Sequence, residues 1–451
     1  MTEPSGATES LARYIAEAAQ APLPAEVELK TRQHLLDTVA ACVSGSRLPA
    51  GLAARPVLER FASQGEASVI GTGVAADVVR AAFANGMSAH GDETDDSHEA
   101  SLIHPGCAIV PAALALAQHL HRSREELVRA VALGYDVAAR MTQALWPDNE
   151  VLRTNGRSSH AIGGLFGAAA SAATLLGLTP RECAFVLSYA AQEASATRTW
   201  TRDVEHIEKA YVFGGMPAMT GTWVGSLVAA GMPGVRDVFT GRPNFLDIVG
   251  IDADLSILAR GLGEDFEIMN TNIKRYCVGS PAQAPIDALL RLMDGSGLSA
   301  QDVEVATLEL PDQLATVVLD RDMPNINLGF LAAVALQDGD VSFAAAHDEE
   351  RFERWRVVPD QRIRIERSMT MAPVRQALAT ISTVDGRQVS LHVDAVRGAY
   401  NNRMSTEEVV VKAKDLFGQV YPSAQGDQLV ESIMGDGEEP DVSDWRQLLG
   451  A

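Results

Sequence analysis

The sequence has 451 residues, 47% hydrophobic and 21% charged, which is typical of a soluble globular protein and argues against a disordered chain, a collagen-like repeat or a polytopic membrane protein. At this length we expect about two to four domains, most simply two. The 37 Lys and Arg against 59 Asp and Glu give a net charge of −22, which disfavours general nucleic-acid binding and contact with an anionic membrane, but does not exclude a small anionic substrate.

The cysteines and the N-terminus indicate the compartment. Four cysteines are widely spaced and form no CxxC pair. This pattern predicts neither a disulfide scaffold nor a zinc module, and it favours a reducing cytoplasm. Residues 1–8 are polar and contain no basic region followed by an apolar run, so no export signal is expected. We therefore expect a cytoplasmic protein.

The first 270 residues predict a mostly helical domain. Apolar residues recur at helical spacing from Leu11 to Ala18, and a second stripe runs from Leu29 through Leu36 to Val43 and ends near Gly45. Further helices are expected over Cys107–Leu120, Ser123–Trp146, Ala161–Leu176 and Pro180–Ser195.

The stretch 161–178 contains 18 residues without a charge, the lower limit for a membrane span. Most of its residues are Ala, Gly or Ser, so its hydrophobicity is weak, and Pro180 follows the stretch as in a soluble helix. Because small side chains let helices approach closely, we expect a buried core helix.

From about Val303 the pattern changes to strands. Residues 362–366 and 389–393 alternate between apolar and polar, and Asp385-Gly386 before the second run is typical of a hairpin. After Arg397 the pattern returns to helix. We predict a mainly α protein with a large all-helical domain (1–270), an inserted smaller α+β lid domain (271–400) and C-terminal helices (401–451) that pack back on the helical domain.

The strongest functional signal is the segment from His90 to His104, which holds five carboxylates and three imidazoles. Such a dense polar group beside apolar helices is costly unless its members pair or perform chemistry. Two other interpretations are an acidic surface loop that caps two helices and a metal site. The segment lacks a recognised ligand spacing such as HExxH, so we expect no metal.

Three further residues are candidates by their surroundings. His160 lies at the start of the small-residue helix, where the helix dipole favours a neutral imidazole, although a packing histidine is the commoner explanation. Lys209 precedes an apolar, glycine-containing run, and Lys274 lies at the predicted domain boundary. Such lysines can hold carboxylates or act as bases, whereas each one alone is more often a surface lysine. No phosphate-binding loop, dinucleotide motif or GxSxG elbow is present.

Taken together, these segments resemble the MmgE/PrpD family, which includes 2-methylcitrate dehydratase, cis-aconitate decarboxylase and iminodisuccinate epimerase. The order and spacing of many short pieces carry the resemblance. They are Leu36-Asp37-Thr38-Val39, Ala81-Ala82-Phe83-Ala84-Asn85-Gly86, Asp95-Asp96-Ser97, His104-Pro105-Gly106, His160 with Gly163 and Gly167, Lys209 with Gly214, Ile273-Lys274-Arg275-Tyr276, Arg397-Gly398 and Asn402-Arg403-Met404-Ser405.

The resemblance implies a cofactor-free enzyme with a helical domain and an α+β lid, usually a homodimer, and an active site between the two domains. Carried over position by position, it implies one set of catalytic residues: Glu93 or Asp95, His104, His160, Lys209 and Lys274. Ser97, Arg275 and Tyr276 are expected to bind substrate.

The chain departs from the family pattern at three places. Glu93 stands where many relatives have Asp, Ser97 stands where they often have Thr, and the segment before the His-Pro step is one residue longer. Relatives that act on tricarboxylates commonly carry an imidazole shortly after the lid lysine, whereas residues 277–283 contain none. The substrate therefore does not transfer with the fold.

The resemblance favours a lyase that dehydrates a small hydroxy-di- or tricarboxylate such as 2-methylcitrate. Such a reaction needs a base for an acidic C–H, cations for the resulting aci-carboxylate, and an acid for the leaving hydroxyl. We expect Lys209 and Lys274, with Arg275, to supply the cations. His104 is the predicted acid or base, oriented by Asp95 or Glu93. His160 is a second acid or base, and Ser97 is a hydrogen-bond donor.

Three alternatives stay open at this point. One is an epimerase or isomerase of an iminodisuccinate-like dicarboxylate, which needs nearly the same groups without activation of a leaving group. Another is a cis-aconitate-like decarboxylase. The third is a non-catalytic member that only binds an acid or a protein partner, which the retained lysines and histidines disfavour.

Overall fold

The computed structural model describes residues 6–61, 65–438 and 441–450. These residues form two compact units. The helical unit contains the chain up to Gly91, then Asp95–Thr271, and the chain from Val409 onward; the sheet unit contains Asp92–Thr94 and Asn272–Glu408. The mainly α fold with a smaller α+β part is confirmed.

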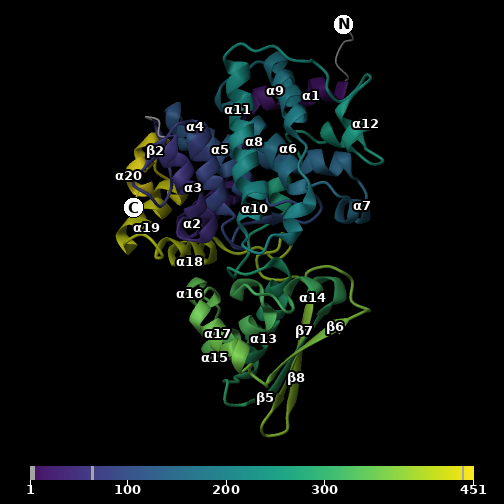
Figure 1. Cartoon of the computed structure of the whole chain (residues 1–451), viewed down its shortest axis with the longest axis vertical. Helices are drawn as coiled ribbons and strands as arrows, with labels where there is room; N and C mark the ends of the chain where they lie inside the picture. The colour runs from purple at the N-terminus through teal and green to yellow at the C-terminus, as the bar shows by residue number, and fades with distance from the viewer. Residues whose placement is uncertain (1–5, 62–64, 439–440, 451) are drawn as a thin grey trace. The chain divides into compact units, whose positions relative to one another are not determined.

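Helix α8 (Ser159–Leu175) lies at the centre of the helical unit, and every one of its residues is buried. It packs against α5 (Gly106–His119), α6 (Arg124–Leu145) and α11 (Met216–Ala229), as Figure 1 shows. The small side chains explain the close packing, since a Cβ atom on Gly167 would lie 2.6 Å from the carbonyl oxygen of Gly134 in α6. The prediction of a buried core helix is confirmed.

The N-terminal helices follow the predicted pattern with one exception. Leu11 and Ile15 of α1 (Gly6–Glu17) are fully buried, and α2 (Ala25–Gly45) ends where predicted. Leu29, however, is 46% exposed, so its assignment to the apolar stripe was wrong. The first turns of α2 bury Val27 instead, and at 100° per residue Leu29 lies about 200° further around the helix.

The helical unit also contains a small sheet and further helices. A two-stranded antiparallel sheet pairs β1 (Ala67–Ser68) with β2 (Ala75–Ala76). Its other helices are α3 (Pro49–Arg60), α4 (Val78–Ala89), α7 (Asn149–Thr154), α9 (Pro180–Glu193), α10 (Ile207–Ala210), α12 (Phe245–Val249), α19 (Ser423–Met434) and α20 (Arg446–Leu449). Helix α18 (Thr406–Phe417) runs from the last residues of the sheet unit into the helical unit.

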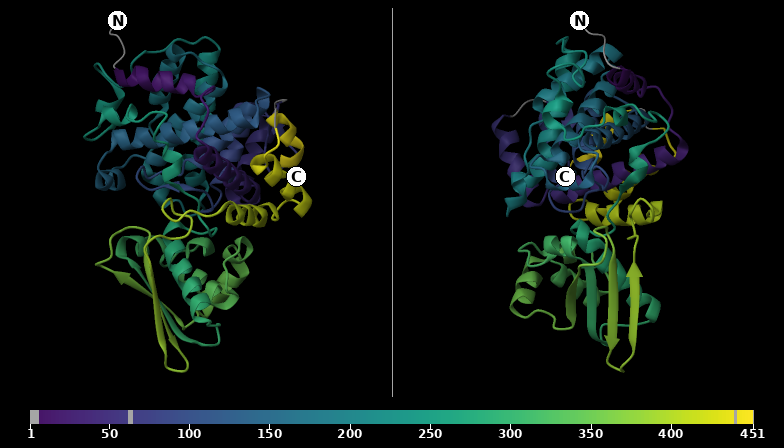
Figure 2. Two further views of the ribbon diagram at one scale, coloured as in Figure 1. Left: turned by 180° about the vertical axis from the view of Figure 1, so that it is seen from behind. Right: turned by 90° about the vertical axis from the view of Figure 1, so that its right-hand side faces the viewer.

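The sheet unit is built on four strands in the order β6-β5-β7-β8. Strand β5 (Val303–Pro311) pairs in parallel with β6 (Ile363–Ser368) and antiparallel with β7 (Ala377–Thr383), which pairs antiparallel with β8 (Gln388–Val393). Helices α13 (Gln283–Ser296) and α15 (Leu328–Asp338) cover one face (Figure 2). Strands β6 and β8 coincide with the two predicted runs, and the antiparallel pairing of β7 with β8 around Gly386, which has a positive φ of 85°, confirms the predicted hairpin.

Two further observations concern the cysteines and the helices. All four cysteines are buried and carry free thiols. Among residues 6–61, 65–438 and 441–450, no helix combines the length and the apolar character that a membrane crossing requires.

Candidate active site

The acidic segment between α4 and α5 is buried. His90, Asp95 and Asp96 are fully inaccessible to solvent, and Asp92, Glu93, Thr94, Ser97 and His98 are almost so. The interpretation as an acidic surface loop is therefore wrong for residues 90–98. Buried carboxylates and imidazoles are tolerated only when they are hydrogen-bonded or paired, so the partners of this segment define the candidate site.

Asp95 bridges two imidazoles in the helical unit. Its Oδ2 atom lies 2.8 Å from Nδ1 of His90, and its Oδ1 atom lies 3.1 Å from Nδ1 of His104. Because an ionised carboxylate can only accept hydrogen bonds, each ring donates its Nδ1–H, and Nε2 then carries the lone pair that can take up a proton. Asp95 therefore orients His104, and His90 is a member of the cluster that the sequence assignment did not include.

The imidazoles of the cluster pack around the aromatic ring of Phe213. His160 stacks on it with ring centroids 3.8 Å apart, and His90 stacks on it at 4.4 Å. The rings of His104 and His160 are 5.3 Å apart. Burial lowers the pKa of His160 well below its ordinary value, and positive charge on His104, His90 and Lys209 would lower it further. His160 is therefore neutral at physiological pH, as the sequence predicted.

Two glycines let Phe213 reach this position. The residues Tyr211–Gly215 form a single π-helical turn before α11, a geometry that is often found at functional sites. A Cβ atom on Gly214 would lie 2.1 Å from the carbonyl oxygen of Gly86 in α4, and one on Gly86 would lie 2.5 Å from that of Gly214. The crossing of the two helices thus requires glycine on both sides.

Lys209 belongs to the same cluster. Its Nζ atom lies 5.3 Å from the centroid of Phe213 and 5.8 Å from that of Trp200, within the range of a cation–π contact. Trp200 also stands edge-on to His160, with ring centroids 5.7 Å apart. The helical unit therefore brings together four of the predicted catalytic residues, Asp95, His104, His160 and Lys209. The stacking of these two rings on the imidazoles carried no sequence signal, because the histidines are remote from them in the chain.

Asp96 anchors the backbone beside His104. Its carboxylate accepts hydrogen bonds from the hydroxyl of Tyr135 at 2.6 Å and from the backbone N–H of Gly106 at 3.0 Å, and it lies 2.7 Å from Nδ1 of His34. Burial lowers the pKa of His34 to about 4, so this imidazole is neutral and donates Nδ1–H. The network fixes the start of α5, two residues after His104.

A buried ion pair lies in the same region of the helical unit. Nζ of Lys412 in α18 is 2.6 Å from Oδ1 of Asp37 in α2, and both side chains are almost completely buried. Burial raises the pKa of Asp37 to about 6, the charge of Lys412 opposes this rise, and the neighbouring charges of Asp96 and Asp95 add to it.

Asp37→Asn is expected to change how stability depends on pH. A carboxyl whose pKa is higher in the folded than in the unfolded state stabilises the protein at low pH, and this contribution is lost as the pH rises through the folded value. Between pH 4 and pH 6 the wild type should lose about 2 kcal/mol through Asp37 that the variant does not lose. Urea unfolding at both pH values tests this; an identical pH dependence in the two proteins would contradict it.

In the sheet unit, Lys274 holds the acidic segment. Its Nζ atom donates a hydrogen bond of 2.7 Å to the backbone carbonyl of Glu93 and lies 3.7 Å from the carboxylate oxygen Oε2 of the same residue. The lysine is 2% exposed. Glu93 thus partners Lys274, whereas Asp95 partners His104, so the two acidic candidates have separate roles.

The three predicted substrate-binding residues lie in different settings. Ser97 is buried in the acidic segment. Tyr276 lies in the apolar core of the sheet unit, and its backbone is bonded to the side chain of Gln283. Arg275 lies over the Tyr276 ring and 3.9 Å from Asp287. Substrate contact by these residues stays a prediction.

Three buried side chains of the cluster have the composition of a metal site. Ligand atoms of His90, Asp95 and Cys107 all lie within 4.8 Å of one another. However, Asp95 already accepts from two imidazoles, and the Cys107 thiol donates to the carbonyl oxygens of His104 and Phe213. Burial and the nearby carboxylates raise the pKa of Cys107 well above its ordinary value, and a protonated thiol is a poor ligand. The hydrogen bonds fit an acid–base cluster better.

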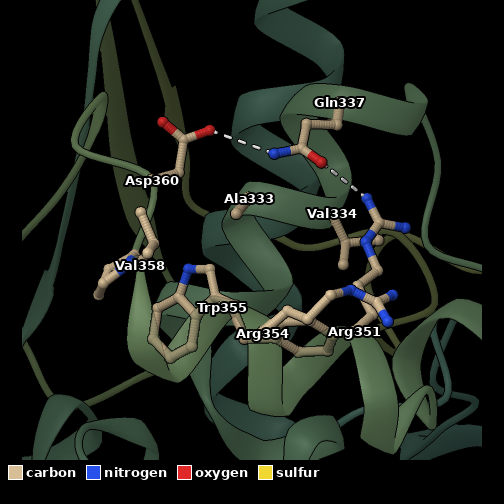
Figure 3. Close-up of a pocket in the computed structure, with 10 residues that line it drawn as sticks. Ala333, Val334, Gln337, Arg351, Arg354, Trp355, Val358 and Asp360 are labelled. Atoms are coloured by element: carbon tan, nitrogen blue, oxygen red, sulfur yellow. Dashed lines mark hydrogen bonds between the residues drawn. The ribbon is translucent and has the colours of Figure 1, made fainter.

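The sheet unit also contains a pocket of about 480 Å³, whose lining residues lie between Phe330 and Asp360. It is lined by α15 and α17 (Glu349–Val357), and Gln337 links Asp360 to Arg351 across its rim (Figure 3). None of the predicted catalytic residues lines it. Its charged groups are already paired, Arg351 with Asp338 and Asp360 with Arg362, so the acid–base cluster remains the candidate site.

Fold and cluster together define the class of the protein. The MmgE/PrpD N-terminal domain matches residues 9–258, and the MmgE/PrpD C-terminal domain matches residues 276–435. The chain therefore belongs to the MmgE/PrpD family, a family of enzymes with dehydratase- and decarboxylase-type reactions.

Three curated relatives are similar to the chain at low identity. A cis-aconitate decarboxylase of Aspergillus terreus is 22% identical over 489 residues, which cover 99% of this chain and 96% of that protein. The cis-aconitate decarboxylase-like protein oryM of Aspergillus oryzae is 25% identical over 64% of this chain, and a cis-aconitate decarboxylase of A. terreus strain NIH 2624 is 23% identical over 64%. The chain spans only 62% and 60% of the lengths of these last two relatives.

Proposed function

We propose that this protein is a lyase that dehydrates a small hydroxy-di- or tricarboxylate, with its own side chains as acid and base. The observation that carries the proposal is a pair of imidazoles in contrasting environments, with centroids 5.3 Å apart. His104 is hydrogen-bonded to the carboxylate of Asp95, whereas the pKa of His160 is lowered by burial. Environments that differ in this way favour one acid and one base.

The two imidazoles divide the proton transfers. His160, which is neutral, takes the acidic proton from the carbon next to a substrate carboxylate. The Asp95 carboxylate stabilises a protonated imidazole at His104, which gives its proton to the leaving hydroxyl. The C–H and C–O bonds break, a carbon–carbon double bond forms, and the hydroxyl leaves as water.

Lysine ammonium groups supply the positive charge that the reaction requires. Removal of the proton places negative charge on the oxygen atoms of the adjacent carboxylate, and a preorganised cation stabilises that charge. We assign this role to Lys209, which lies beside the aromatic rings of the cluster, and to Lys274, which is buried and oriented by Glu93.

Decarboxylation of a cis-aconitate-like acid is the second candidate. It is favoured by the similarity to proteins named cis-aconitate decarboxylase, one of them aligned over 99% of the chain. In that reaction the bond to a carboxylate breaks, the electron pair is delocalised toward another carboxylate, and one imidazole donates a proton to carbon. The second imidazole would then have no leaving hydroxyl to protonate.

Incubation in deuterated water with citrate-, succinate- and malate-like acids and cis-aconitate distinguishes these reactions. Loss of water, seen as an alkene product by NMR, supports dehydration, and release of carbon dioxide supports the second candidate. Deuterium at the α-carbon without loss of either group would indicate an epimerase instead. No chemical change and no exchange with any acid would overturn the proposal, and a sample without enzyme serves as the blank.

A further inference from the structure

The imidazole of His347 lies between two hydrogen-bond acceptors. It follows α16 (Phe343–Ala346) in the sheet unit, where its Nδ1 atom is 2.8 Å from the backbone carbonyl of Phe343. Its Nε2 atom is 2.9 Å from Oδ2 of Asp92, and only 15% of its side chain is exposed. The carbonyl accepts a hydrogen bond from Nδ1–H, and the carboxylate beside the other ring nitrogen favours positive charge on the ring. This close ion pair favours the imidazolium form.

The electrostatic surroundings agree with that assignment. Burial by itself would lower the pKa of His347, but the hydrogen bond to Asp92 and the charges of Asp92 and Glu349 raise it. The ring also stacks on Phe343, with centroids 4.1 Å apart. Each ring nitrogen of His347 thus has a partner: one forms the ion pair with Asp92, and the other contacts the backbone carbonyl of Phe343 in α16.

Asp92 connects His347 to the acidic segment. Besides its ion pair with His347, its carboxylate accepts the backbone N–H of Thr94 at 2.8 Å and the hydroxyl of Thr94 at 2.7 Å. These contacts close a turn whose middle residue is Glu93. The carbonyl of Glu93 is the atom that receives the 2.7 Å hydrogen bond from Lys274.

We propose that His347 is a positioning residue for Lys274: it fixes Asp92, which fixes the turn at Glu93, which orients the lysine ammonium toward the substrate carboxylate. The inference rests on the proposed role of Lys274 in the reaction. His347 lies in the connection between α16 and α17, far from Lys274 in the sequence, and acts on it through Asp92 and Glu93.

The test uses the full-length protein with two variants and one control. His347→Gln keeps a polar side chain but loses the charge and the second ring donor. Asp92→Asn keeps the shape of the acceptor but loses its charge. His392→Gln is the control, because His392 is an exposed imidazole of β8 in the same unit, bonded to Gln376. Hydrogen–deuterium exchange of the peptide covering residues 92–94 measures the anchor, and steady-state kinetics with the acid that the wild type turns over measures its consequence.

We expect faster exchange at residues 92–94 in both variants, with the β7 peptide unchanged. We also expect kcat/KM to fall by about 10- to 100-fold, with a larger change in kcat than in KM, because Lys274 is assigned to the charge that develops during proton removal and a misplacement of about 1 Å has effects of this size. The double variant should lose no more than either single one. The control should match the wild type in both measurements.

Two results would overturn the inference. Unchanged exchange at residues 92–94 would show that His347 does not anchor the turn. Faster exchange with unchanged kcat/KM would show that the anchor does not position Lys274. If the wild type turns over none of the acids, the proposed function fails, but the exchange measurement still decides whether the anchor exists.

Discussion

His104→Ala is expected to lower kcat by about 10²–10⁴-fold, the range that general acid–base catalysis by one side chain contributes. The imidazole is oriented by a hydrogen bond to Asp95 and lies beside the second imidazole, His160. Its removal takes away the proton donor for the leaving hydroxyl but leaves the lysines that bind carboxylates. KM should therefore change much less than kcat, which steady-state kinetics measures.

The control for this variant is His119→Ala. His119 lies in the last turn of α5, the helix that follows His104, but its side chain is half exposed and pairs with an exposed glutamate, Glu66. It should retain wild-type kinetics. Full activity of His104→Ala, with an unchanged melting temperature, would remove His104 from the mechanism.

Lys274→Gln is expected to reduce kcat/KM by about 10²–10³-fold. This is the typical effect of removing one preorganised donor to a negative charge that develops in the reaction. Glutamine can still donate to the carbonyl of Glu93, so the turn should persist while the positive charge is lost. The measurement is steady-state kinetics, together with the affinity for citrate as a carboxylate probe.

Lys414→Gln is the matched control, because this lysine is half exposed and forms a surface pair with Asp427. It removes the same charge from a position in α18 of the helical unit, so its kinetics should match the wild type. Wild-type kcat/KM in Lys274→Gln would assign that lysine a structural role only, and the positioning role of His347 would fail with it.

The sequence was most informative where one local pattern dominates. The run of small residues at 161–178 predicted α8, since such a stretch can be satisfied only in a tightly packed core. The hairpin at Asp385-Gly386 followed from the left-handed conformation that glycine adopts easily. Leu29 shows the limit of this reasoning, because an apolar residue near a helix end can lie on either side of the buried stripe.

The partners of the site residues could not be predicted in this way. The sequence left Glu93 and Asp95 as alternatives for orienting His104, and the hydrogen bonds assign Asp95 to it. The stacking of Phe213 on His160 and the ion pair of His347 with Asp92 carry no local signal, because each contact joins residues far apart in the chain. The sequence identifies the candidate residues, whereas their contacts with one another depend on how the helices pack.

Loss of the α-proton of the substrate into deuterated water, followed by NMR, tests the central claim most directly. The claim is that the imidazole cluster of the helical unit breaks a C–H bond next to a carboxylate. The wild type should replace that proton with deuterium or eliminate it during turnover, and His160→Ala should do neither at a measurable rate. Rapid loss of the proton in His160→Ala, or turnover by the wild type in which the α-proton is fully retained, would contradict the account.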